Sequence, residues 1–164
     1  MTEQYALESA LKELDLKEKG PIGTSPWITI TQEDIDGFGK VTRDLDPMHV
    51  DPEWCAAKGP FPTTIAFGFL SLSLITHMSH EAREWTEGTY ALNYGFNKVR
   101  FVAPVPVGSR VRGHFTFMSA KPRDDGSILT TTAVTVEIDG EERPAVTAEW
   151  LGVFYPPSIQ KKLV

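Results

Sequence analysis

The segment from Arg43 to His49 contains an aspartate and a histidine whose spacing suits general acid and base chemistry. Asp44 and His49 are separated by four residues that include Pro47, so we expect a loop that folds both side chains toward one point. A carboxylate and an imidazole held in this way can activate a water molecule. The same residues also fit a structural role, because an aspartate before a proline can stabilise a turn and a histidine can fill a polar niche.

An uncharged segment, Ile65-Ala66-Phe67-Gly68-Phe69-Leu70, follows this loop. A helix that begins at Gly68 would present unpaired backbone N–H groups and the positive end of its dipole to a ligand. Such groups stabilise a carbonyl oxygen that gains negative charge during a reaction. Glycine is also common where helices begin or backbones pack closely, so the signal depends on its position after the Asp44 and His49 loop.

Composition places the chain among ordinary globular proteins. Its 164 residues are 41% hydrophobic and 23% charged, which predicts one domain. The net charge of -6, with dispersed Lys and Arg, argues against nucleic acid as a partner. Cys55 is the single cysteine, and the N-terminus shows no basic start or long apolar run, so we expect a cytoplasmic protein that does not contact a membrane.

The first half of the sequence predicts short helices around the Asp44 and His49 loop. Leu7, Leu11 and Leu14 have helical spacing and predict a surface helix that ends by Gly20. Residues 27–30 predict a short strand. Two further helices are expected, one capped by Thr31 with Asp34 and carrying Ile35, Phe38 and Val41, and one that begins at Asp51-Pro52 and stops at Gly59-Pro60.

The remaining residues predict a buried helix followed by a sheet. Residues 69–78 carry no charge on any face, which predicts a helix surrounded by protein. After Gly88 the apolar residues alternate, and a change of parity near Asn97 predicts a bulge. Asp139-Gly140 marks a hairpin. An antiparallel meander with one buried helix gives the α+β class.

A sheet wrapped around a single apolar helix is the hotdog arrangement, and the motifs resemble those of the MaoC-like dehydratases. Residues 44–49 are similar to that family's Asp-x-Asn-Pro-x-His signature, and residues 65–70 to its Ala-His-Gly-Met/Phe-Leu element. The resemblance covers roughly residues 25–156, so we expect a single hotdog domain over 1–164 with a helical extension at 1–24. The subgroup that the chain most resembles is the nodulation-protein-N-like (R)-specific enoyl-CoA hydratases, through Gly59-Pro60-Phe61, Leu70-Ser71-Leu72-Ser73-Leu74 and Asn93 to Phe101.

The resemblance implies reversible addition of water to the double bond of a trans-2-enoyl thioester, giving an (R)-3-hydroxyacyl thioester. Asp44 and His49 would hold the water, and the Gly68 N–H would polarise the thioester carbonyl. The substrate would be an acyl-CoA or an acyl-carrier-protein thioester, with no metal or redox cofactor. It also implies a homodimer with both active sites near the interface.

Further residues are candidates for binding the substrate. Phe67, Phe69 and Ser71 are expected beside the acyl group, and Lys98 and Arg100 could neutralise CoA phosphates, although cations on alternating strand positions are more often a solvated face. The spacing of His77, His80, Glu81 and Glu84 is compatible with a metal site. No second cluster supplies the remaining ligands, so we expect none.

Three positions depart from the family pattern. Arg43 stands where the family usually has glycine, Asp46 where it has Asn or Gln, and Phe67 where histidine is frequent. Two other functions share the fold. A hotdog thioesterase often uses Asp or Glu in the first turns after the glycine, and this chain has none there. A non-catalytic acyl-thioester-binding subunit would lose the acid and base pair, whereas Asp44 and His49 are both present.

Overall fold

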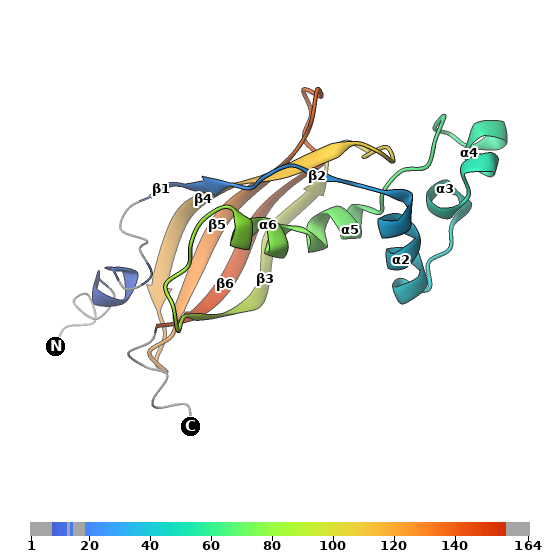
Figure 1. Cartoon of the computed structure of the whole chain (residues 1–164). Coiled ribbons are helices and arrows are strands. Elements are labelled where there is room, and N and C mark those ends of the chain that lie inside the picture. Colours follow the sequence, from blue (N-terminus) through green and yellow to red (C-terminus); the bar gives the residue numbers. More distant parts are fainter. Residues whose placement is uncertain (1–7, 13, 15–18, 157–164) are drawn as a thin grey trace.

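In the computed structural model of the chain, which describes residues 8–12, 14 and 19–156, a curved antiparallel sheet forms the backbone of the fold (Figure 1). The strand order is β1-β4-β5-β6-β3, and the short strand β2 also pairs with β4. The strands are β1 (Gly20–Thr24), β2 (Ile28–Thr29), β3 (Tyr90–Phe101), β4 (Arg110–Pro122), β5 (Ile128–Ile138) and β6 (Val146–Tyr155).

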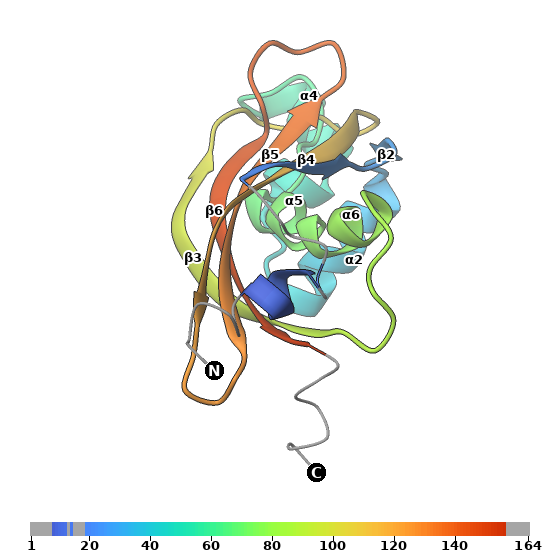
Figure 2. The same ribbon diagram turned by 90° about the vertical axis from the view of Figure 1, so that its left-hand side faces the viewer.

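The helices gather on one face of this sheet (Figure 2). Residues 8–12 are helical, and the labelled helices are α2 (Gln32–Thr42), α3 (Pro47–Val50), α4 (Pro52–Lys58), α5 (Gly68–Ser73) and α6 (Ile75–Glu81). Figure 1 shows α6 against the sheet, α5 continuing from it, and α2, α3 and α4 beyond the end of α5. The predicted hotdog arrangement is confirmed.

The main core lies between the α5–α6 segment and the inner face of the sheet. Ile75 and Met78 are fully buried against Val111, Val134 and Val136 of the central strands. Burying such apolar side chains is the principal source of folding free energy. No helix among the described residues is long and apolar enough to cross a membrane.

Helix caps are where the sequence predicted the structure best. The Thr31 side chain accepts a hydrogen bond from the Asp34 backbone N–H, and the Asp34 carboxylate accepts one from the Thr31 N–H, which completes a capping box. Asp51 accepts a hydrogen bond from the Trp54 N–H and caps α4. Both caps depend on residues three positions apart, so the local sequence is sufficient to specify them.

The central helix differs from the continuous buried helix that the sequence predicted. It divides into α5 and α6 at Leu74, where the Ser73 hydroxyl donates to the Phe69 carbonyl at 2.7 Å. Serine hydroxyls that bond to the preceding turn often bend helices. Phe69 is 65% exposed, because the sheet covers only one side of the helix. Val41 of α2 is also exposed rather than part of the core.

The sheet order also corrects the expected meander. β4, β5 and β6 follow one another as predicted, but β3 lies at the far edge beside β6 instead of beside β4. Residues 102–109, which connect β3 to β4, pass along the helix side of the sheet. In this connection, Pro106 forms an antiparallel bridge with Ile65, which precedes α5. The predicted bulge is present, since the β3–β6 register shifts between Phe96 and Lys98. Strand β1, rich in glycine and proline, was not predicted because its pairing with β4 is tertiary.

The outer face of β4 and β5 carries a small charged network. The Glu137 carboxylate accepts hydrogen bonds from Arg112 Nε and from His114 Nε2, each at 2.6 Å. The hydrogen bond from Arg112 has the largest effect on the pKa of Glu137, which it lowers, and the hydrogen bond from His114 lowers this pKa further. The folded state therefore favours the carboxylate form of this side chain.

We predict that Glu137→Gln lowers the free energy of unfolding at pH 7 by about 0.5–1 kcal/mol. A lowered folded pKa adds stability above the unfolded value of 4.5, and this stability is lost as the pH falls through the folded pKa. The difference between the parent and the variant should therefore shrink below pH 4.5 in urea titrations. Glu142→Gln, a change to an exposed hairpin residue without a described partner, should show no such difference.

Candidate active site

His49 lies in α3, and its ring has a fixed tautomer. The His49 Nδ1 atom is 2.7 Å from the backbone carbonyl oxygen of Ile65. A carbonyl can only accept, so Nδ1 carries the proton and donates it. In the neutral ring, Nε2 then has a free lone pair and can accept a proton from water.

An aromatic side chain lies against this imidazole. The rings of His49 and Phe67 have centroids 3.9 Å apart, with an angle of 30° between the ring planes. The centroid of the Phe67 ring also lies 5.3 Å from that of Phe38 in α2. Phe67 is buried. The Phe67 ring therefore packs against the imidazole of His49. The phenylalanine that stands here instead of the family's frequent histidine thus has a packing role.

The amide of Gln32 joins three segments behind His49. Its Nε2 donates to the backbone carbonyl of His49 at 2.9 Å and to Asp36 at 2.7 Å, and its Oε1 accepts a hydrogen bond from Thr64 at 2.5 Å. Thr64 is fully buried. Sequence reasoning missed Gln32 and Thr64, because neither stands in a motif and their contact spans 32 residues.

Cys55 of α4 supports the same loop. Its buried Sγ lies 3.6 and 3.5 Å from the backbone carbonyl oxygens of Pro47 and Met48. Burial, followed by the nearby charges of Asp51 and Asp46, raises the pKa of the Cys55 thiol. The thiol therefore stays protonated at neutral pH and is a packing group rather than a nucleophile.

Asp44 follows a sharp end to helix α2. Arg43 is the C-cap and has left-handed backbone angles of φ 62° and ψ 22°, which glycine adopts at lower cost. The Asp44 carboxylate accepts the Asp46 N–H at 3.3 Å, and the Asp46 carboxylate accepts the Met48 N–H at 2.9 Å and caps α3. Two departures from the family pattern thus have local explanations. Arg43 tolerates a strained turn that costs about 1 kcal/mol, and Asp46 caps a helix.

Gly39 allows this turn to close. The Asp44 N–H donates to the Gly39 carbonyl at 3.1 Å. A Cβ atom at Gly39 would lie 2.8 Å from the Asp44 carbonyl oxygen, which belongs to the backbone and cannot rotate away. The absence of a side chain at Gly39 therefore determines how closely the Asp44 loop approaches α2.

His49, Gly68 and Ser71 line one cavity of about 220 Å³, which we call the proximal cavity. Helix α5 begins at Gly68 without a side-chain cap, and the Gly68 N–H has no hydrogen-bond partner among the described residues. A Cβ atom at Gly68 would lie 2.9 Å from the ring of Phe101, which also lines the cavity. The cavity therefore combines an imidazole and an unpaired backbone donor, the two kinds of group that a proton transfer beside an oxyanion requires.

Other predicted site residues lie outside this cavity. Asp44 is exposed and does not line it, and Phe69 points to the surface, where its ring meets Phe101 at 5.3 Å. Lys98 pairs with Glu149 at 2.9 Å, and the register places Arg100 opposite Thr147. Glu149 and Thr147 alternate with the inward-facing residues of β6, so both cations project from the face of the sheet opposite the helices.

The histidines and glutamates at the end of α6 do not converge. Among the described residues, no group of three or more His, Cys, Asp or Glu side chains is placed to hold a metal ion.

Comparison with known proteins identifies a matching family and two similar proteins. The family described as MaoC like domain matches residues 15–138. The 3-hydroxyacyl-thioester dehydratase Z of Mycobacterium tuberculosis is 46% identical over 128 residues, which cover 78% of this chain and 84% of that protein. Nodulation protein N of Rhizobium leguminosarum bv. viciae is 46% identical over 133 residues, or 80% and 83% of the two chains.

Solved structures confirm the fold. An (R)-hydratase from A. caviae involved in PHA biosynthesis superposes with a TM-score of 0.64 at 24% identity, over 82% of this chain and 95% of that one. The monoamine oxidase regulatory protein from Archaeoglobus fulgius gives a TM-score of 0.71 at 24% identity, over 85% and 92%. At these identities the likeness establishes the hotdog architecture alone.

We predict that Gly39→Ala destabilises the protein by about 1–3 kcal/mol, because the new methyl group would push the Asp44 backbone away from α2. Gly37→Ala, two residues earlier in the same helix, is the matched control. A Cβ atom there meets nothing within 4 Å, so this change should stabilise the helix by about 0.5–1 kcal/mol. Denaturant unfolding of both variants measures the contrast, and equal effects would contradict the proposed close approach.

Proposed function

The chain belongs to the family of MaoC-like domains, and we propose that it is an (R)-specific hydro-lyase acting on acyl thioesters. It adds water to a trans-2-enoyl thioester and removes water from an (R)-3-hydroxyacyl thioester. One observation carries this proposal. His49, with its Nδ1 proton donated to Ile65, shares a cavity with the unpaired N–H of Gly68. The 46% identity to a 3-hydroxyacyl-thioester dehydratase supports the same chemistry.

Gly68 acts on the thioester carbonyl. When the carbonyl oxygen accepts a hydrogen bond from the Gly68 N–H, electron density moves toward that oxygen and the β-carbon becomes electrophilic. Charge builds on the oxygen as an enolate forms, so the hydrogen bond strengthens in the transition state. The positive end of the α5 dipole adds to this effect.

Asp44 and His49 act on the water. Held between the two side chains, the water loses a proton to one of them as its oxygen bonds to the β-carbon. A proton is delivered to the α-carbon on the same face, which neutralises the enolate. The atoms of one water molecule are then added across the double bond, and the reverse sequence removes them. The proposed steps involve only protons and water.

The remaining site residues have supporting roles in this proposal. Phe67 holds the imidazole of His49, and Ser71 forms part of the wall beside the thioester. Phe69 would contact substrate only from the outer side of α5. Lys98 and Arg100, on the opposite face of the sheet, would reach the phosphates of a CoA or of a carrier-protein arm only across an interface with a second copy.

The distribution of carboxylates favours hydration over thioester hydrolysis. Between Gly68 and Glu81, the central helix has no Asp or Glu that could direct water to the thioester carbon. The proposed acid and base residues stand before α5, Asp44 between α2 and α3 and His49 in α3, and of these two His49 lines the proximal cavity. We place this reaction in the cytoplasm, in agreement with a single cysteine that is a buried free thiol.

We also propose that two chains pair through β3. This strand bonds to β6 on one side only, and its other edge is open. Its exposed apolar side chains are Tyr90, Leu92, Tyr94, Phe96 and Phe101. A long apolar edge strand is a pairing site, and antiparallel pairing of two such edges would join the sheets of two copies. Because Phe101 also lines the proximal cavity, that cavity would open beside the interface.

The activity is tested with crotonyl-CoA, a short trans-2-enoyl thioester, by loss of the absorbance of its conjugated thioester. We expect hydration to an (R)-3-hydroxyacyl product without release of free thiol. Asp44→Asn and His49→Gln should each lower kcat/KM by about 10²–10⁴. The asparagine keeps an oxygen that can accept the Asp46 N–H, so the loop should persist.

A control variant and a measurement of free CoA distinguish the possible outcomes of this test. Asp124→Asn, in the β4–β5 turn, should retain the parent rate. Release of free CoA would show a thioesterase instead. If Asp44→Asn and His49→Gln fold and hydrate as fast as the parent, the assigned roles are wrong.

Pairing through β3 is tested by the mass of the protein in sedimentation equilibrium. The parent should sediment as twice the chain mass, and Tyr94→Lys should shift the population toward monomer, because a buried ammonium opposes burial of the apolar strip. Thr116→Lys places the same charge on an exposed position of β4 and should leave the dimer intact. A parent protein that is monomeric at micromolar concentration would refute the pairing.

A further inference from the structure

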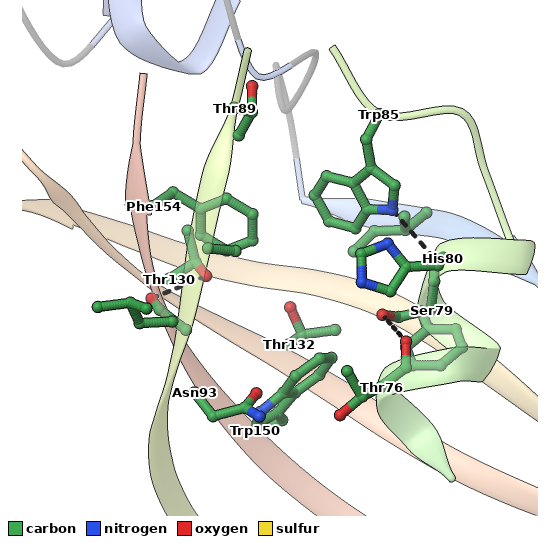
Figure 3. A pocket seen from close by; sticks show the side chains of 15 residues that line it. Thr76, Ser79, His80, Trp85, Thr89, Asn93, Thr130, Thr132, Trp150 and Phe154 are labelled. Atoms are coloured by element: carbon green, nitrogen blue, oxygen red, sulfur yellow. Dashed lines mark hydrogen bonds between the residues drawn. The ribbon is translucent and has the colours of Figure 1, made fainter. Parts of the chain in front are cut away.

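A second cavity, which we call the distal cavity, lies between α6 and strands β3, β5 and β6 (Figure 3). Its volume is about 160 Å³, and it shares no lining residue with the proximal cavity. An engineered protein cavity of about 150 Å³ holds one benzene molecule, so the distal cavity has room for a group of about six carbons.

The two cavities lie at successive positions along the central helical segment, each between that segment and the sheet. Gly68 and Ser71 line the proximal cavity, and Thr76 lines the distal one, eight residues after Gly68 along the helical segment. At 1.5 Å per helical residue, this separation is about 12 Å. Strand β6 contributes to both cavities in the same order, first Val146 and then Trp150. A medium-length acyl chain that runs from a thioester near Gly68 parallel to the helical segment has the length to end in the distal cavity.

The walls of the distal cavity are partly aromatic. The rings of Trp85 and Phe154 are stacked with centroids 5.5 Å apart at 18°, and Trp150 and Phe115 also line the cavity. Such walls suit the carbon atoms of an acyl chain.

The lining also contains hydroxyl groups that the protein leaves unpaired. The Thr130 hydroxyl donates to the Gly152 carbonyl, and the Ser79 hydroxyl donates to the Thr76 carbonyl. In contrast, the side-chain hydroxyls of Thr76 and Thr132 make no hydrogen bond to the described residues, although both residues are half-buried. Figure 3 shows Thr132 in the middle of the lining side chains.

We propose that the distal cavity binds the far end of the acyl chain and selects chains that carry a hydroxyl group there, with Thr132 as the specificity-determining residue. This inference rests on the proposed function, because that function supplies the acyl thioester. A plain alkyl end would exclude water from the Thr132 hydroxyl and offer no replacement partner, which carries a free-energy penalty. A terminal hydroxyl can donate to Thr132 and accept from it, so the penalty is removed.

The test compares the binding of decanoyl-CoA and 10-hydroxydecanoyl-CoA by isothermal titration calorimetry. Both are saturated, so binding is measured without turnover. We expect the parent protein to bind the hydroxylated thioester about tenfold more tightly, and Thr132→Val, which keeps the shape of the side chain, to bring the ratio of the two Kd values close to one. Thr132→Ser should restore most of the preference. Because each ratio is taken within one variant, a partial loss of folded protein does not change it.

Thr131→Val is the matched control, because Thr131 is the next residue on β5 and faces the opposite side of the sheet. This variant should keep the parent ratio. A parent ratio near one, or an unchanged ratio in Thr132→Val, would overturn the inference. Hydration of crotonyl-CoA tests the proposed function separately, since that acyl group is too short to reach the distal cavity.

Discussion

The hydrogen bond from His49 Nδ1 to the Ile65 carbonyl connects the two parts of the chain on which the site depends. The helical loop supplies the imidazole, and the segment that leads into α5 supplies the acceptor. Only two residues separate Ile65 from Gly68, so the bond that fixes the tautomer of His49 also places the ring near the first N–H of α5. One interaction thus fixes both the tautomer of the neutral ring and the position of the imidazole.

The segment that carries this acceptor is itself held by the sheet connection. The Ala66 N–H donates to the Val105 carbonyl at 2.8 Å, and the Val107 N–H donates to the Thr64 carbonyl at 2.9 Å. These bonds require residues 102–109 to pass on the helix side, which is possible because β3 lies at the far edge of the sheet. The crossing that sequence periodicity failed to predict is therefore what anchors the site to the fold.

How much could be predicted from the sequence depended on how far apart in the sequence the interacting residues lie. The Thr31 cap and the bulge near Asn97 result from neighbouring residues, and local patterns were sufficient for both. The contact of Gln32 with the His49 carbonyl and with Thr64 requires three separate segments to meet, and no local pattern encodes it. Positive charge on a strand identified Lys98 as a candidate, but the face of the sheet to which it belongs follows from its pairing with Glu149.

The loop around Asp44 shows how two departures from a family motif fit the local backbone. Arg43 keeps the left-handed turn that a glycine would make at lower cost, and Asp46 supplies the cap that an asparagine would also supply. With both residues in place, the hydrogen bond from the Asp44 N–H to the Gly39 carbonyl closes the turn that ends α2. The backbone of this loop sets where the Asp44 carboxylate begins, and the two departures act on that backbone through a left-handed turn at Arg43 and a helix cap at Asp46.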